Sequence, residues 1–262
     1  MKDKELIEIK NLSFSYGENE ILKNISLAVF KGESISIVGM SGAGKSTLLK
    51  SICNLKNSNS IVSGQILLNS ISNNSFLEKN RGKIGFLFQT LSLLPNLTVE
   101  KNIKFPTKII DKKIIDKKLF DNIIKMVGLE NHRKKYLSEL SGGMKTRVAL
   151  ASVYMTKPEI LLLDEPFASL DVAWKYELYK KFFELKNEYK TTEIIVTHDI
   201  QESIILSNKV YILKRNGTFG KSYEINRDDI NIKKLNDLKY FLKSNNETYL
   251  DIQNEILKDM EN

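Results

Sequence analysis

The sequence predicts an α/β fold with a mostly parallel sheet, an antiparallel β subdomain and a helical subdomain. Five short apolar segments have the length and composition of buried strands: residues 33–38, 83–89, 159–163, 193–197 and 209–213. Helical segments at residues 45–53 and 175–189 separate some of these strands. Strands that alternate with helices are typical of a parallel sheet covered by helices.

Two regions depart from this alternation. Three further short strands are expected near the N-terminus, over residues 6–14, 25–30 and 65–68. Polar, Asn- and Ser-rich turns are expected around the last of them, at residues 57–63 and 69–82. From residue 98 to about 154 the apolar residues recur at helical spacing, and Gly128 ends one of these helices. A helical insert is therefore expected between strands.

Composition excludes several classes of protein. The chain has 262 residues, of which 42% are hydrophobic and 27% charged, as in soluble globular domains. No stretch approaches the about 18 to 20 consecutive apolar residues of a membrane-spanning helix, and the N-terminus lacks the apolar core of a secretory signal. The single cysteine, Cys53, excludes an internal disulfide, favours a cytoplasmic setting, and is expected to be a small buried hydrophobe rather than a nucleophile.

The net charge of +8 by itself identifies no partner. Five of the 40 basic residues are arginines, and the lysines alternate with acidic residues along the predicted helices. This pattern favours an ordinary solvated surface over a nucleic-acid-binding surface, so no nucleic-acid partner is expected.

A phosphate-binding loop follows the predicted strand at 33–38. Residues 39–46 match the pattern G-x-x-x-x-G-K-[ST], and Thr47 follows them. The loop consists of Gly39, Met40, Ser41, Gly42, Ala43, Gly44, Lys45, Ser46 and Thr47. The glycines let backbone N–H groups turn toward phosphates, and the following helix adds the positive end of its dipole. Lys45 supplies a charge to the β- and γ-phosphates, and the Ser46 hydroxyl is offered to Mg²⁺. ATP and Mg²⁺ are thus the expected ligands.

Two adjacent carboxylates end the apolar strand at 159–163. In an open α/β sheet, ligands lie at the carboxyl ends of the strands. Asp164 is expected to bind Mg²⁺, directly or through water, while Glu165 polarises the attacking water as general base.

A second anion site is predicted at the start of another helix. Ser141, Gly142, Gly143 and Met144 follow Leu140 and precede a helical stretch, so a hydroxyl and two glycine N–H groups meet a helix N-terminus. With one phosphate-binding loop in the chain, this site is expected to serve the nucleotide of a second copy. The segment resembles the signature sequence of the ATP-binding cassette (ABC) ATPases, which implies a P-loop NTPase fold of the ABC type.

The resemblance extends to four weaker motifs across nearly the whole chain. Tyr16 matches the aromatic residue that stacks on adenine, and Gln89 matches the glutamine that contacts Mg²⁺ and the lytic water. Asp171, in Ser169-Leu170-Asp171, matches the loop that acts across the dimer, and His198 matches the switch histidine that contacts the γ-phosphate. Ser152 departs from the family, which usually has arginine there, and this change could loosen a helix contact.

The resemblance also implies a domain organisation. An ABC ATPase domain is expected over residues 1–225, with the helical subdomain inserted at about 90–155. A helical extension is expected over residues 226–262.

Finer features are similar to one group of importers, the ATPase subunits of nitrate, sulfonate, taurine and thiamine-precursor uptake systems. These features are Met144, where many cassettes have glutamine, and the segments at residues 94–99, 141–150, 164–171 and 197–202. The group resemblance implies a peripheral protein on the cytoplasmic face of the cell membrane that hydrolyses ATP as a dimer. The implied partners are a second copy of the chain, integral-membrane permease subunits and an extracytoplasmic solute-binding protein.

Three alternatives stay open at this point. The first is an ABC ATPase for export or lipoprotein release, and the second is a soluble ABC ATPase that acts on nucleic acid or ribosomes. The third is a P-loop kinase, which would have no need of the signature segment or of His198. The transported solute cannot be predicted, since selectivity belongs to the permease and its binding protein.

Overall fold

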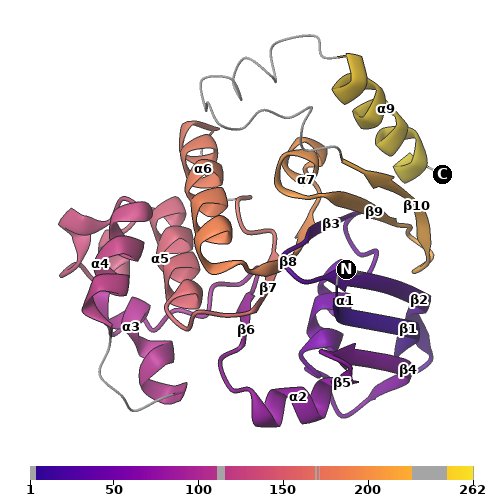
Figure 1. Ribbon diagram of the computed structural model, residues 1–262, viewed down its shortest axis with the longest axis horizontal. Coiled ribbons are helices and arrows are strands. Elements are labelled where there is room, and N and C mark those ends of the chain that lie inside the picture. The colour runs from indigo at the N-terminus through magenta and orange to yellow at the C-terminus, as the bar shows by residue number, and fades with distance from the viewer. Residues whose placement is uncertain (1–3, 111–115, 169, 171, 226–246, 262) are drawn as a thin grey trace. The chain divides into compact units, whose positions relative to one another are not determined.

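The computed structural model describes residues 4–110, 116–168, 170, 172–225 and 247–261. The chain divides into two units. Figure 1 labels their helices and strands. The first unit combines Met1–Lys79 with Thr192–Asn262, and the second is Asn80–Thr191. Each is described by itself.

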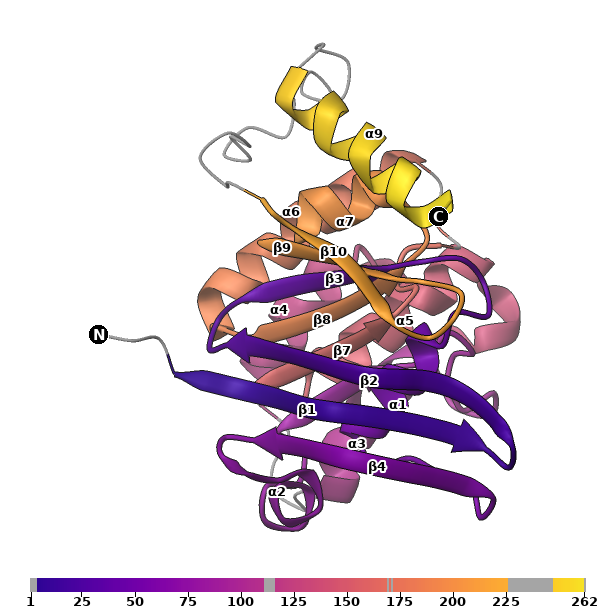
Figure 2. The same cartoon turned by 90° about the vertical axis from the view of Figure 1, so that its right-hand side faces the viewer.

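The first unit contains an antiparallel sheet in the order β2-β1-β4-β5 (Figure 2). Its strands are β1 (Glu5–Tyr16), β2 (Asn19–Phe30), β4 (Ser60–Leu68) and β5 (Ile71–Ser72). Buried residues alternate along β1, among them Ile7, Ile9 and Phe14, as expected for a strand with one face in the core. The predicted antiparallel subdomain is confirmed.

The same unit contains a parallel group of strands. The central strand β3 (Ser34–Val38) pairs in parallel with β8 (Thr192–Thr197) and with β9 (Lys209–Leu213), and β9 pairs antiparallel with β10 (Phe219–Glu224). Every residue of β3 and β8 is buried, as expected for central strands of a parallel sheet covered on both faces.

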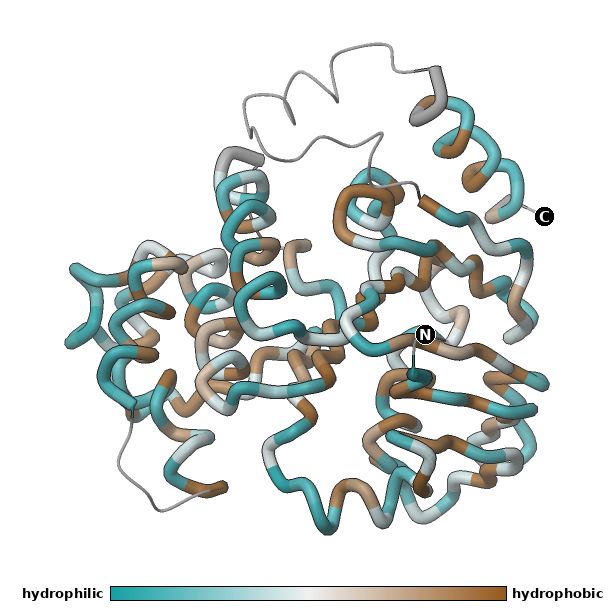
Figure 3. Tube along the Cα trace, in the orientation of Figure 1, coloured by the Kyte–Doolittle hydropathy of each residue, from teal (hydrophilic) through white to brown (hydrophobic). Residues whose placement is uncertain are grey.

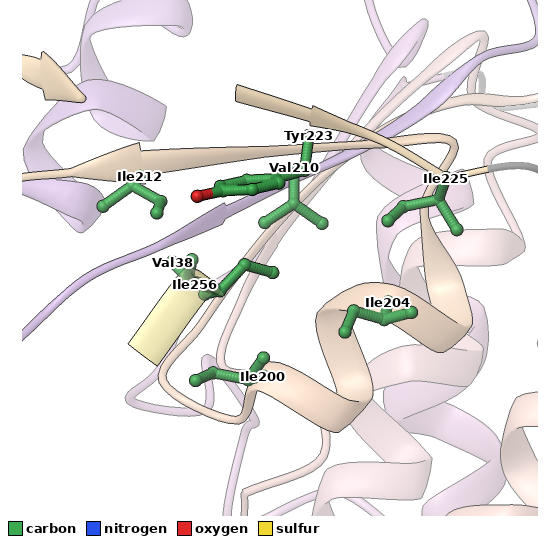
Figure 4. Packing of buried hydrophobic residues seen from close by; sticks show 8 residues of the cluster. All are labelled: Val38, Ile200, Ile204, Val210, Ile212, Tyr223, Ile225 and Ile256. Carbon is green, nitrogen blue, oxygen red and sulfur yellow. The ribbon is translucent and has the colours of Figure 1, made fainter. Parts of the chain in front are cut away.

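The described residues of the first unit also form four helices. They are α1 (Lys45–Ile52), α2 (Asn73–Lys79), α7 (Ile200–Leu206) and α9 (Glu247–Glu261). Hydrophobic residues recur along α9 (Figure 3), and Ile256, which is fully buried, joins a cluster that we call the α9 cluster (Figure 4). Its members are Val38, Ile200, Ile204, Val210, Ile212, Tyr223, Ile225 and Ile256. The cluster thus supports the last residue of β3.

The second unit pairs β6 (Ile84–Leu87) in parallel with β7 (Ile160–Asp164). Its α-helices are α3 (Val99–Ile110), α4 (Lys117–Met126), α5 (Gly142–Tyr154) and α6 (Val172–Tyr189), with two short 3₁₀ helices at Glu130–His132 and Leu137–Glu139. Asp116 caps α4 by accepting a hydrogen bond from the backbone N–H of Leu119, and Gly128, at a φ of +63°, follows the end of the helix. The predicted α/β class, with its helical subdomain, is confirmed.

Some local predictions were wrong. Residues 60–63, predicted to be a turn, belong to β4, and residues 73–79, also predicted to be a turn, form α2. The short helix α7 and the strand β10 were not predicted at all. Cys53 is half-buried rather than buried, although desolvation raises the pKa of its thiol to about 12.

Candidate functional site

The loop after β3 uses glycine where no other residue fits. A Cβ atom on Gly39 would lie 2.3 Å from the carbonyl oxygen of Leu213 on β9. Gly44 has a φ of +98°, and a Cβ atom there would lie 2.9 Å from side-chain atoms of Ile21 and Leu22 on β2. Close packing at one position and left-handed backbone at the other therefore both require glycine.

The ammonium group of Lys45 lies inside this loop. Lys45 is only 6% exposed, and its Nζ donates to the carbonyl oxygens of Gly39 at 2.8 Å and Met40 at 3.0 Å. A buried cation needs such partners, because its desolvation is otherwise costly. The remaining loop residues divide into three groups: Met40, Ser41 and Gly42 are exposed, Ala43 is buried, and Ser46 and Thr47 are half-buried.

His198 leaves the sheet beside the phosphate-binding loop. Val38 of β3 is matched with Thr197 of β8, so His198 and the loop both begin one residue after this pair. The backbone N–H of Asp199 donates to the Thr197 hydroxyl at 3.1 Å, and the Asp199 carboxylate accepts from the N–H of Glu202 at 3.0 Å, which caps α7. The imidazole of His198 is exposed, and its backbone is held by the strand pairing of Thr197 before it and by the hydrogen bonds of Asp199 after it.

Tyr16 is the last residue of β1 and is half-buried. Its ring lies 4.9 Å from the ring of Phe14 at an interplanar angle of 71°. This edge-on contact orients the ring at the end of the antiparallel sheet.

The second unit holds the acidic pair. Asp164 ends β7 and is 3% exposed, while Glu165 is half-buried. Glu165 has a φ of +50°, a left-handed conformation that costs a residue with a side chain about 1 to 2 kcal/mol. Strained backbone of this kind is concentrated at functional sites.

Gln89 follows the strand that pairs with β7. Leu87 of β6 is matched with Leu163 of β7, so Gln89 and Glu165 each stand two residues beyond the same pair. Both therefore lie at the carboxyl edge of this pair of strands, and the Gln89 side chain is exposed.

The predicted second anion site is the N-terminus of the 13-residue helix α5. The Ser141 hydroxyl accepts a hydrogen bond from the backbone N–H of Met144 at 3.3 Å, which makes Ser141 the N-cap. Ser141 and Gly142 are exposed, Gly143 and Met144 are half-buried, and a Cβ atom on Gly142 would meet nothing within 4 Å. Ser152, farther along α5, donates from its hydroxyl to the carbonyl oxygen of Ala149 at 2.7 Å.

The structure thus distributes the predicted residues between the units. The phosphate-binding loop, His198 and Tyr16 belong to the first unit, whereas Asp164, Glu165, Gln89 and the segment at 141–144 belong to the second. Ser169 and Asp171 lie outside the described residues.

Two supporting residues were not predicted. The capping role of Asp199 was not predicted, although the spacing Asp199-x-x-Glu202 is the sequence signal of a capped helix. The contact of Leu213 with Gly39 has no local signal, because it joins residues far apart in the sequence.

No helix in the described ranges is long and apolar enough to cross a membrane.

Comparison with known proteins agrees with these features. Residues 22–168 match the family model described as ABC transporter. The aliphatic sulfonates import ATP-binding protein SsuB of Bacillus cereus is 36% identical over 252 residues, which are 96% of this chain and 93% of that protein. The spermidine/putrescine import ATP-binding protein PotA of Thermotoga maritima is also 36% identical, over 86% of this chain and 61% of its own length.

Solved structures agree as well. The dimeric structure of the ABC transporter cassette MJ0796 has a TM-score of 0.75 and 31% identity, and covers 84% of this chain and 99% of that one. A second dimeric structure of MJ0796, in a post-hydrolysis state with ADP and Pi, is equally similar, with 30% identity. The resemblance inferred from the motifs is confirmed, and the chain belongs to the ABC transporter family as one of its ATP-binding, ATP-hydrolysing subunits.

Proposed function

We propose that this subunit hydrolyses Mg²⁺-bound ATP in a nucleotide-sandwich dimer, and so drives a separate membrane permease that takes up a small anionic or vitamin-precursor solute. The observation that carries the proposal is the buried Lys45 ammonium, held by two carbonyl oxygens of its own loop at the end of β3. Phosphate oxygens are stronger acceptors for this cation than neutral carbonyls are.

ATP binding uses the first unit. The N–H groups at the start of α1 and the Lys45 ammonium bind the β- and γ-phosphates, and the Tyr16 ring stacks on adenine. Because the Tyr16 ring is already oriented by Phe14, little conformational entropy is lost when the base binds.

Three oxygen donors fit Mg²⁺. They are the Ser46 hydroxyl, the Asp164 carboxylate and the Gln89 amide carbonyl, and Mg²⁺ prefers oxygen ligands completed by phosphates and water. When bound, the ion neutralises the charge that develops on the phosphates.

Hydrolysis uses the carboxylate of Glu165, the residue with the left-handed backbone. Glu165 accepts a proton from the water whose oxygen attacks the γ-phosphorus, while the bond to the bridging oxygen of ADP breaks. Gln89 orients this water, and His198 donates a hydrogen bond to the γ-phosphate. The products are ADP and inorganic phosphate.

The segment at 141–144 completes the site of a second copy, and Asp171 acts across the dimer. The dimeric MJ0796 cassette supports this arrangement. Closing and opening of the dimer moves the helical insert, which passes the motion to permease subunits at the cytoplasmic face of the membrane.

The proposed direction of transport and the proposed class of solute are based on the names of related proteins. SsuB, 93% of whose length this chain matches, is named for aliphatic sulfonate import, which supports uptake of an anionic solute. An extracytoplasmic solute-binding protein is proposed from the motif resemblance to that group of importers. Coexpression with candidate permeases tests the association. The chain is expected in the membrane fraction only when its permease is present, and solute uptake by such cells then gives the direction.

Replacement of the base tests the reaction. Glu165→Gln is expected to retain ATP binding but to hydrolyse ATP about 10² to 10⁴-fold more slowly, since a positioned base contributes that much. The variant should accumulate as an ATP-bound dimer, detected by light scattering. Glu159→Gln is the matched control, because Glu159 directly precedes β7, at the end opposite to Glu165, and pairs with Lys83 in a partly exposed ion pair. Equal hydrolysis by the two variants would assign the base elsewhere.

A further inference from the structure

We propose that Arg147 and Trp174 form a positioning contact that makes the signature helix α5 and the start of α6 move as one element. The inference rests on the proposed dimer. Ser141 lies six residues before Arg147 on α5, and Asp171 lies three residues before Trp174. The contact therefore joins the two elements that are proposed to act on the nucleotide of the second copy.

The contact is a stack of a guanidinium group on an indole ring. The guanidinium carbon of Arg147 lies 3.9 Å from the centroid of the Trp174 ring, well inside the range of a cation–π interaction. Arg147 is 6% exposed, whereas Trp174 is 39% exposed. The cation is thus largely removed from water, and such contacts are stronger when desolvated.

A third element fixes the pair in place. The Arg147 Nη1 donates to the carbonyl oxygen of Val127 at 2.8 Å, at the C-terminal end of α4. A Cβ atom on Gly128 would lie 3.0 Å from the Trp174 ring and 3.3 Å from Arg147 Nη1, so both side chains pack directly on this glycine. The end of α4 therefore holds Arg147 in the orientation that the stack requires.

This arrangement restricts relative motion of α5 and α6. A leucine could fill the same space, but apolar contact is not directional, and it would let one helix slide on the other. The planar guanidinium has one face on the indole ring and a hydrogen bond at its edge, so displacement of the start of α6 breaks the stack. Trp174 acts through Arg147 and the helices, and not by touching nucleotide.

Variants in the Glu165→Gln background separate this role from simple packing. Trp174→Leu is expected to leave ATP affinity within about twofold by calorimetry, because the phosphate-binding loop is unchanged. It should raise the ATP concentration for half-maximal dimerisation about tenfold, and Trp174→Phe should restore part of this loss. Tyr176→Leu is the matched control, since Tyr176 lies on the same helix and packs on Tyr179 instead. In the chain with Glu165 intact, Trp174→Leu should raise the KM for ATP in step with the loss of dimerisation and leave kcat at saturating ATP little changed, whereas Tyr176→Leu should leave both unchanged.

Fluorescence provides a test without substitution at the contact. Trp174 is the only tryptophan in the chain, so the emission of Glu165→Gln protein reports this contact alone. The emission is expected to shift with ATP, at the same midpoint as dimerisation.

The outcomes distinguish the two proposals. Failure of the Glu165→Gln parent to dimerise with ATP overturns the proposed function and this inference with it. If the parent dimerises, two results would overturn the inference alone. One is a Trp174 emission spectrum that does not change when ATP is added, and the other is half-maximal dimerisation of Trp174→Leu at the same ATP concentration as the parent. It is also overturned if Trp174→Leu and Tyr176→Leu weaken dimerisation equally and in step with thermal stability.

Discussion

Val38 of β3 and Thr197 of β8 occupy matched positions in a parallel pair, and each is the last residue of its strand. The phosphate-binding loop and His198 therefore leave the sheet side by side. Their proximity depends on backbone register between two buried strands, and not on a flexible side chain.

His198→Ala should lower the rate of ATP hydrolysis without preventing ATP binding. We expect a loss of about 10² in kcat, the usual effect of removing one preorganised hydrogen-bond donor to a developing charge. The strand register and the cap at Asp199 do not involve the imidazole, so the fold should persist. His132→Ala serves as control, because His132 is the other histidine and lies in a 3₁₀ helix of the second unit. Equal kcat values for the two variants would remove His198 from the reaction.

The sequence was most informative where the pattern is local. The strands at 34–38 and 209–213 are rich in isoleucine, valine and leucine, and their predicted bounds agree with the structure to within one residue. Prediction failed where the local signal is weak. The helix α2 is a short, polar helix with one buried residue, Phe76, and its asparagines and serines are equally typical of turns.

Non-local features of the candidate site could not be predicted. The left-handed conformation of Glu165 has no signal in a glutamate, which normally avoids it. The stack of Arg147 on Trp174 joins residues on different helices, so it depends on how α5 and α6 pack. Sequence spacing does identify the Ser141 cap, because a cap is a contact within four residues of chain.

Cys53 is expected to be unreactive in the folded protein. Desolvation raises the pKa of its thiol to about 12, so at pH 8 the folded chain has roughly 10³-fold less thiolate than the unfolded chain, whose thiol pKa is about 9. Alkylation by iodoacetamide, followed by mass spectrometry, should be correspondingly slow until urea is added.

The same pKa has a consequence for stability. Between pH 9 and 12 the unfolded chain loses the thiol proton while the folded chain keeps it, so the free energy of unfolding should fall as the pH rises through this window. Cys53→Ser should reduce that dependence and abolish alkylation. Native protein that is alkylated as fast as unfolded protein would contradict the assignment.

Ile256→Ala should detach α9 from the first unit. Ile256 is fully buried in the α9 cluster, and such truncations cost roughly 2 to 5 kcal/mol. Adjacent polar contacts, from Tyr223 to Asp259 at 2.8 Å and from Lys221 to Glu255 at 3.0 Å, are partly exposed and should not compensate. Urea unfolding and hydrogen exchange along α9 measure the effect.

Leu257→Ala is the matched control for this change. Leu257 is the next residue and is 42% exposed, so its truncation should alter stability by no more than about 0.5 kcal/mol. Equal destabilisation by the two variants would mean that α9 does not dock through Ile256.

The exposed Ser141 cap of α5 leads to a test of action across the dimer. Lys45→Ala should abolish ATP binding and Ser141→Arg should block the signature, so neither homodimer should hydrolyse ATP. If the signature serves the opposite copy, a heterodimer of the two variants carries both lesions at one site and none at the other. Mixing should then restore ATPase activity, with a maximum near equal amounts. If the signature served its own chain, every site would contain one lesion and no ratio could restore activity. A mixture of Lys45→Ala with the double variant Lys45→Ala/Ser141→Arg is the control, since all its phosphate-binding loops are defective. A heterodimer that forms with ATP yet traps no nucleotide at its intact site would refute the sandwich arrangement.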